Sequence, residues 1–220
     1  ITLGRGPHEM FYDALTNSMY ITNKADNTIT VIDLEKNKII QTIKAGNSPE
    51  GIVVTDKKIY VTNALDQVVV MIDKELGSTE KEIRVGQDPT HLMLSEDKRK
   101  IYALNKGSDD ISLIATNIDA VTEVWFAGDD PERFAMSPHE RFLYVSSLDG
   151  LVTVLPARQP KLYREVMVGL GASEIAFSPN NVVAAVVNSE ENTISLTSLT
   201  SDLVLATIDV GVHPSDVVIT

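Results

Sequence analysis

The residues best suited to bind a ligand stand at one repeated position, two residues after the end of a recurring Gly-x-x-Pro step. In chain order this position holds Glu9, Gly51, His91, Arg133, Glu174 and Asp216. Three carboxylates, one imidazole and one guanidinium around one opening could hold a cation, a polar small molecule or a loop of a partner protein. We therefore predict a ligand-binding site formed by Glu9, His91, Arg133, Glu174 and Asp216. Solvated loop ends beside a water-filled channel are the alternative.

Histidine is a common metal ligand, but the histidines of this chain form no metal motif. His8, His91, His139 and His213 lie in different parts of the repeat, with no i,i+4 pair. The chain has no cysteine, which excludes disulfides, thiolate metal sites and a Cys-x-x-Cys-His haem attachment within it. We predict no metal and no cofactor. His91 as a single axial ligand is the alternative to an ordinary hydrogen-bonded histidine.

The sequence also contains none of the catalytic motifs that we looked for along the chain. Gly169-Leu170-Gly171-Ala172 resembles a phosphate-binding loop, but no helix pattern follows it and no Lys-Ser/Thr ends it. There is no Gly-x-Ser-x-Gly elbow, and the acidic pairs Asp109-Asp110 and Asp129-Asp130 fall at different corners of the repeat. We assign no catalytic residue, and the sequence favours a protein that is not an enzyme.

The elements that must position these residues come from an internal repeat of about forty residues. The glycines of the Gly-x-x-Pro step, with Ala172 replacing one proline, follow one another at intervals of 40 to 42 residues. A second marker, Tyr60-Val61-Thr62-Asn63 and its counterparts, keeps the same spacing. Chance does not produce two markers in register over the whole chain.

Each repeat contains four short strand patterns. In the first repeat they are Glu9 to Asp13, Met19 to Asn23, Thr28 to Leu34 and Lys38 to Lys44. Between the second and third strands lie residue pairs that tolerate the positive φ of tight turns. These predicted hairpin tips are Asp26-Asn27, Asp66-Gln67, Asp109-Asp110, Asp149-Gly150 and Glu191-Asn192.

A four-stranded unit of this length cannot bury both of its faces alone, and units packed radially around an axis solve the problem. We therefore predict an all-β propeller of four-stranded antiparallel blades, with a stack of sandwiches as the alternative. Five complete blades fit in residues 1–220, which we expect to form a single propeller domain. Ile1 to Gly4 matches the last strand of a blade and Ser215 to Thr220 matches the first strand of another. These fragments suggest a parent of six to eight blades, truncated here at one or both ends.

The motifs of the second repeat resemble those of a known protein family. Tyr60-Val61-Thr62-Asn63 followed by Val70-Met71-Ile72-Asp73, inside the Gly-x-x-Pro frame, resembles the YVTN-repeat β-propellers over essentially the whole chain. The fourth and fifth repeats depart from the pattern at Ser146-Ser147 and Ala184-Ala185. The resemblance implies a seven- or eight-bladed, WD40-like disk of prokaryotic surface-layer or exported proteins. It therefore implies a periplasmic, extracellular or cell-surface location.

Charge and hydropathy narrow the range of partners. Nineteen Lys and Arg against 31 Asp and Glu give a net charge of -12, which repels phosphate backbones, so we predict no nucleic-acid partner. The longest apolar runs, such as Val182 to Val187, are far shorter than the ~20 residues that span a bilayer, so we predict no membrane span. The partner remains a protein, a small molecule, or further blades or domains of a larger parent chain.

Two functions fit these observations best. The first is a non-catalytic binding or scaffolding propeller that uses a disk face or the channel mouth. The second, implied by the resemblance alone, is the propeller domain of a haem-dependent oxidoreductase of the nitrite-reductase kind. A carbohydrate-active propeller is a third, and it would need Glu9, Glu174 and Asp216 to converge.

Overall fold

The computed structural model describes residues 1–220 and contains five four-stranded antiparallel sheets, which confirms the all-β prediction. The first sheet consists of β1 (Pro7–Asp13), β2 (Ser18–Asn23), β3 (Thr28–Asp33) and β4 (Lys38–Lys44). The second consists of β5 (Pro49–Val54), β6 (Lys58–Asn63), β7 (Val68–Asp73) and β8 (Thr79–Arg84). The third consists of β9 (Pro89–Leu94), β10 (Lys100–Asn105), β11 (Asp110–Ala115) and β12 (Ala120–Phe126). The fourth consists of β13 (Pro131–Met136), β14 (Phe142–Ser147), β15 (Leu151–Pro156) and β16 (Arg164–Met167), and the fifth of β17 (Ala172–Phe177), β18 (Val183–Asn188), β19 (Thr193–Ser198) and β20 (Val204–Asp209).

The only helices are two short 3₁₀ turns, Lys106–Ser108 and Pro138–Glu140. Neither is long and apolar enough to cross a membrane. The chain divides within β12 into two compact units, residues 1–124 and 125–220. The prediction of one domain over residues 1–220 stays a prediction.

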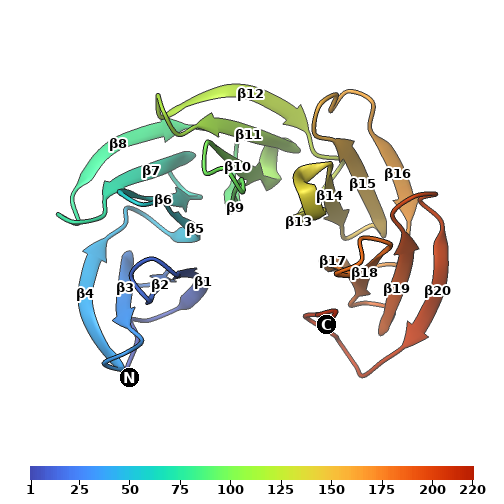
Figure 1. The fold of residues 1–220 in the computed structure, drawn as a ribbon, viewed down its shortest axis with the longest axis horizontal. Coiled ribbons are helices and arrows are strands. Elements are labelled where there is room, and N and C mark those ends of the chain that lie inside the picture. The colour runs from blue at the N-terminus through green and yellow to red at the C-terminus, as the bar shows by residue number, and fades with distance from the viewer. The chain divides into compact units, whose positions relative to one another are not determined.

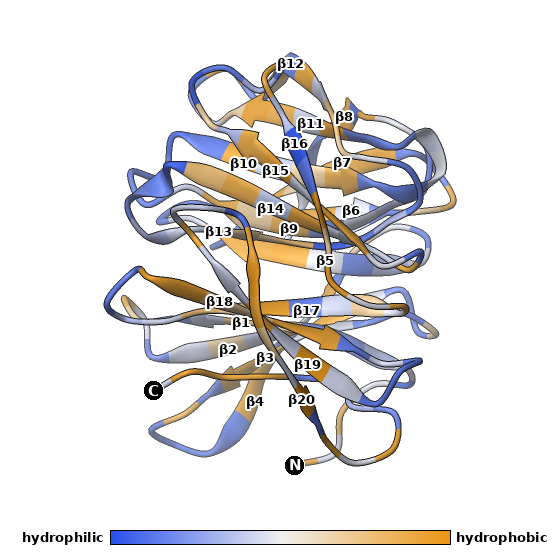
Figure 2. Cartoon of the chain, turned by 90° about the vertical axis from the view of Figure 1, so that its right-hand side faces the viewer, coloured by the Kyte–Doolittle hydropathy of each residue, from blue (hydrophilic) through white to orange (hydrophobic).

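Within each unit the sheets pack face to face. In the first unit β1 lies beside β5 and β5 beside β9, and in the second unit β13 lies beside β17 (Figure 1). The first strand of each sheet is therefore the inner one, and the fourth strand is the outer one. Figure 2 shows hydrophobic residues along middle strands such as β10 and β18. In the first unit Val31 and Ile43 share a buried cluster with Ile52 and Ile59, so the core lies between neighbouring sheets.

The predicted hairpin tips and end strands had different outcomes. One member of every predicted tip pair has positive φ, namely Asn27, Gln67, Asp109, Gly150 and Asn192. Residues 1–6 and 210–220, which contain the two end fragments, form no strand in this chain. A strand is stabilised by a ladder of hydrogen bonds to a neighbour, and neither end segment pairs with another strand of this chain.

The two sequence markers of the repeat meet in space. The asparagine that ends the second strand packs against the glycine of the Gly-x-x-Pro step, so closely that a Cβ on Gly46 would lie 1.8 Å from Nδ2 of Asn63. Gly4 stands in the same relation to Asn23, and Gly169 to Asn188. Asn23 also donates from Nδ2 to Oγ1 of Thr30 across the hairpin, at 2.8 Å. The glycine and the asparagine are thus in contact in four sheets, whereas in the fourth sheet Gly128 faces Thr153 and Ser147 replaces the asparagine.

The tyrosine of the second marker provides a matched pair of positions for a test of hydrogen bonding. Tyr60 donates its hydroxyl to Oδ1 of Asp119 at 2.5 Å, whereas the hydroxyl of Tyr144 is buried without a hydrogen-bond partner. Burial raises the pKa of Tyr144 to about 12. The turn of the fifth sheet also offers an aspartate, Asp202, but Arg164 binds it.

We expect Tyr60→Phe to lower the free energy of unfolding by about 1–3 kcal/mol, because Asp119 loses a buried donor. Tyr144→Phe should leave that free energy unchanged or slightly higher, because it removes a hydroxyl that has no partner. Urea denaturation of both variants at neutral pH measures the difference. An equal loss in the two variants would contradict this account.

Candidate functional site

The candidate site residues stand where the first strand of each sheet begins, and the pairing is irregular at this point in all five sheets. The irregularity lies between Pro7 and Met10 in β1, between Pro49 and Ile52 in β5, and between Ala172 and Ile175 in β17. β9 and β13 have a similar shift within their first three residues. A bulge of this kind redirects side chains and is common beside functional sites.

A hydroxyl from the second strand stabilises this bulge in three sheets. Oγ1 of Thr62 accepts a hydrogen bond from the backbone N–H of Gly51 at 2.7 Å and donates to the carbonyl of Thr90 in the next sheet. Thr22 makes the same bridge from Glu9 N–H to the Glu50 carbonyl. Ser146 donates to the carbonyl of Ser173 at 2.5 Å, linking the fourth and fifth sheets. The threonine of the repeat thus holds the inner strands in place, whereas Leu104 and Val187 carry no hydroxyl there.

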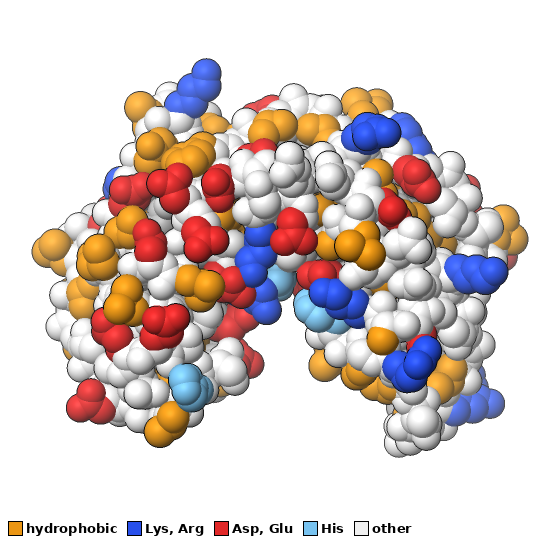
Figure 3. Space-filling view, turned by 180° about the vertical axis from the view of Figure 1, so that it is seen from behind, with side chains coloured by type: hydrophobic (Ala, Val, Ile, Leu, Met, Phe, Trp, Pro, Cys, Tyr) orange, Lys and Arg blue, Asp and Glu red, His pale blue; other side chains and the backbone are white.

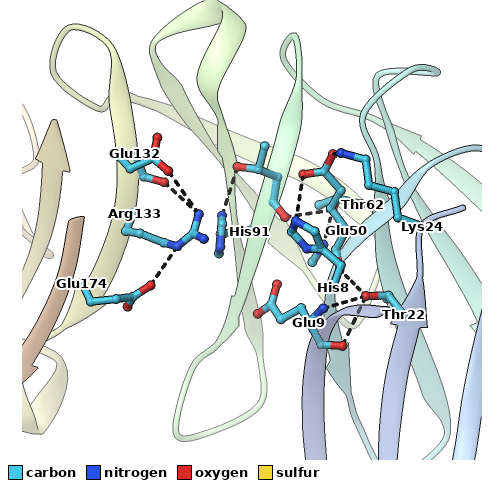
Figure 4. A network of polar contacts seen from close by, with 12 residues as sticks. His8, Glu9, Thr22, Lys24, Glu50, Thr62, His91, Glu132, Arg133 and Glu174 are labelled. Carbon is cyan, nitrogen blue, oxygen red and sulfur yellow. Dashed lines mark hydrogen bonds and ion pairs between the residues drawn. The ribbon is translucent and has the colours of Figure 1, made fainter. Parts of the chain in front are cut away.

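In the first unit the bulged strand starts surround a buried carboxylate (Figure 4). Glu50 is only 6% exposed, and it is the one charged residue in β5, a strand in which every residue is buried. Its Oε1 lies 2.5 Å from Nζ of Lys24, and its Oε2 lies 4.0 Å from Nε2 of His8. Figure 4 shows the three side chains pointing toward one another. An acidic group, an ammonium group and an imidazole therefore meet at one end of the inner strands.

Sequence reasoning missed Glu50 and Lys24 as site residues. The available signal was a lone glutamate inside an otherwise apolar buried strand, beside a proline. Of the residues predicted for this unit, Glu9 lies on β1 and His91 on β9. The backbone N–H of Glu9 donates to Thr22, and Nδ1 of His91 lies 3.1 Å from Oγ1 of Thr90. Both belong to the same network of inner-strand polar contacts (Figure 4).

In the second unit the structure brings two of the predicted residues together. Nε of Arg133, on β13, donates to Oε1 of Glu174, on β17, at 2.9 Å. Glu132 adds a second carboxylate, with Oε1 3.6 Å from Nη1 of Arg133. Asp216 lies outside the strands, is exposed, and accepts a hydrogen bond from the backbone N–H of Val217. The second unit therefore presents two carboxylates around one guanidinium.

Ion pairs of this kind can order polar groups at the strand ends and present hydrogen-bonding atoms to a ligand. Arginine holds a carboxylate in a defined orientation through charge-assisted hydrogen bonds. No group of three or more His, Asp or Glu side chains is arranged to hold a metal ion. The predicted ligand-binding role of Glu9, His91, Arg133, Glu174 and Asp216 stays a prediction.

Four-stranded antiparallel sheets that repeat along the chain and pack face to face are the blades of a β-propeller. The sequence of residues 1–162 matches the family described as "Lactonase, 7-bladed beta-propeller", and the chain belongs to this family. The fold is similar to a solved structure of hydrazine synthase from Kuenenia stuttgartiensis, with a TM-score of 0.62 and 15% sequence identity over 99% of this chain and 90% of that chain. A likeness at this identity shows the fold alone. No curated protein sequence matches this chain.

Proposed function

We propose that this chain is a non-catalytic binding or scaffolding propeller that engages a cationic partner through the ends of its inner strands. The observation that carries the proposal is the group of Glu132, Arg133 and Glu174, in which two carboxylates share one guanidinium and leave a net negative charge. Figure 3 shows Asp and Glu side chains gathered over the second unit, with few Lys or Arg among them. The partner that suits this surface is a basic peptide or a small polyamine.

The overall charge supports the same partner class and argues against nucleic acid. A net charge of -12 attracts cationic groups and repels phosphates over distances up to the Debye length, about 8 Å at physiological salt. The resemblance to YVTN-repeat proteins supports a periplasmic, extracellular or cell-surface location.

We expect tetralysine to bind the chain saturably in a calorimetric titration and tetraglutamate not to bind. Glu174→Gln should weaken tetralysine binding about fivefold, because it removes one of the two carboxylates beside Arg133. The control is Glu165→Gln, which removes an exposed carboxylate on the outer strand β16 and should bind as the unchanged protein does. Absence of tetralysine binding, or an equal loss in the control, would contradict the proposed partner.

A second candidate function, lactone hydrolysis, is favoured by the family description and by one contact. The imidazole of His8 and the carboxylate of Glu50, 4.0 Å apart, resemble a base and its orienting group. Acid release from δ-valerolactone in a pH-stat separates the candidates. Release that Glu50→Gln abolishes would overturn the non-catalytic proposal, whereas no release above the buffer supports it.

The haem-dependent alternative predicts visible-region absorbance of the full-length protein.

A further inference from the structure

A polar pocket lies in the second unit, at the opposite end of β13 from Arg133. It has a volume of about 280 Å³ and is lined by Ser137, Arg141, Phe142, Arg164, Asn181 and Thr200, with one leucine. Ser137 follows the last residue of β13, whereas Arg133 is the third residue of that strand. At about 3.3 Å per residue, the two sites are separated by most of the strand length.

Two guanidinium groups flank one aromatic ring in this pocket. Cζ of Arg164 lies 4.8 Å from the ring centroid of Phe142, and Cζ of Arg141 lies 6.0 Å from it. Such contacts hold cationic groups over an aromatic face and keep their edges available for hydrogen bonds. Arg141 lies in the connection between β13 and β14, whereas Arg164 is the first residue of β16, and only the fold brings them to the same ring.

The positive charge of the pocket is only partly neutralised. Asp202 binds Arg164 through Nε and Nη2, which uses two of the five N–H donors of this guanidinium. No carboxylate pairs with Arg141, which is exposed at the pocket edge. One cation therefore remains without a counter-charge, in a chain with a net charge of -12.

The remaining lining supplies neutral hydrogen-bond donors and one apolar wall. Oγ of Ser137 accepts from the backbone N–H of Phe142, so its own proton is available to a ligand. Asn181 and Thr200 add an amide and a hydroxyl. The ring of Phe142 and the side chain of Leu199 form the apolar part of the lining.

We propose that this pocket binds the phosphate or carboxylate group of a small organic anion, held by Arg141 and by the free N–H groups of Arg164. Planar guanidinium groups recognise both oxyanions through paired, charge-assisted hydrogen bonds. Phe142 and Leu199 would contact the carbon skeleton of the ligand. The pocket is thus an anion site in an otherwise acidic protein, and it is separate from the inner-strand ends to which the cationic partner is assigned.

The test is calorimetric titration of the whole chain with phenyl phosphate and with benzoate at constant ionic strength. We expect saturable binding of at least one probe, and the comparison of the two shows which oxyanion the pocket prefers. Arg141→Gln should weaken that binding about tenfold or more, since it removes a charged hydrogen-bond donor. Arg141→Lys should recover only part of the affinity, because an ammonium group lacks the planar fork.

The matched control is Arg158→Gln, which removes another exposed arginine of the same unit outside the pocket lining. Binding by this variant should equal that of the unchanged protein. Thr200→Val gives a second variant that keeps every charge, and it should weaken binding severalfold. The proposal is overturned if neither probe binds, or if Arg141→Gln and Arg158→Gln bind equally well.

Discussion

Asp13→Asn is expected to lower the free energy of unfolding by about 3–5 kcal/mol, because it leaves a buried ammonium group without its counter-charge. Oδ2 of Asp13 lies 2.7 Å from Nζ of Lys74, and the two side chains are only 11% and 10% exposed. The pair joins the first and second sheets through residues 61 positions apart. Urea denaturation at neutral pH measures the loss.

Two comparisons separate the buried charge from other effects of the substitution. Asp13→Asn combined with Lys74→Met removes both charges, so most of the lost stability should return. Asp56→Asn breaks the exposed pair of Asp56 and Lys98 and should have a much smaller effect, because solvent screens it. If Asp13→Asn and Asp56→Asn destabilise equally, the pair between Asp13 and Lys74 is not a buried one.

The same pair predicts a dependence on pH. Burial raises the pKa of Asp13, but hydrogen bonds from Lys74 and Thr16 and the charge of Lys74 together outweigh burial, so the pKa lies below the ordinary 3.8. The folded state therefore holds this proton less tightly than the unfolded state, and the stabilisation present above pH about 4 is lost as the pH falls through the lowered pKa. The stability difference between the unchanged protein and Asp13→Asn should shrink accordingly.

The fold could be predicted from the sequence because each repeat has similar strand patterns and turn residues at the same positions. The hairpin tips were found because asparagine, aspartate and glycine tolerate positive φ, as Asn27 and Gly150 show. Residues 1–6 and 210–220 form no strand here, because a strand pattern without a pairing neighbour does not form a strand, and their assignment to incomplete blades stays a prediction. Sequence periodicity thus located the elements, and pairing decided which of them formed.

The candidate site was only partly predictable, for a geometric reason. The rule of two residues after the proline assumes a regular strand, in which side chains alternate between the faces. The bulge after Pro49 breaks this alternation, and Glu50, one residue after the proline, takes part in the buried network. The pocket of Arg141 and Arg164 could not be predicted from the sequence, because strand pairing and packing bring these residues to Phe142, and no repeat marker includes them.

Gly46→Ala is expected to lower the free energy of unfolding by about 2–5 kcal/mol, for two reasons that add. Gly46 has φ of 81°, a conformation that costs an L-residue about 1–2 kcal/mol. The new Cβ would also lie 1.8 Å from Nδ2 of Asn63, and overpacking a closed interior costs about 1–3 kcal/mol. Asn63 is 1% exposed and has no room to move away. Denaturant unfolding of the variant measures the sum.

The two causes can be separated within the same chain. Gly211→Ala is the control, because a Cβ there would meet no atom within 4 Å, and its unfolding should be almost unchanged. Asn63→Ala removes the side chain that the new Cβ would strike, so Gly46→Ala should cost less in that background, and only the backbone cost should remain. An equal cost of Gly46→Ala with and without Asn63 would show that the glycine is required for its φ alone. A reduced cost would mean that the glycine and asparagine of the repeat are retained as a pair.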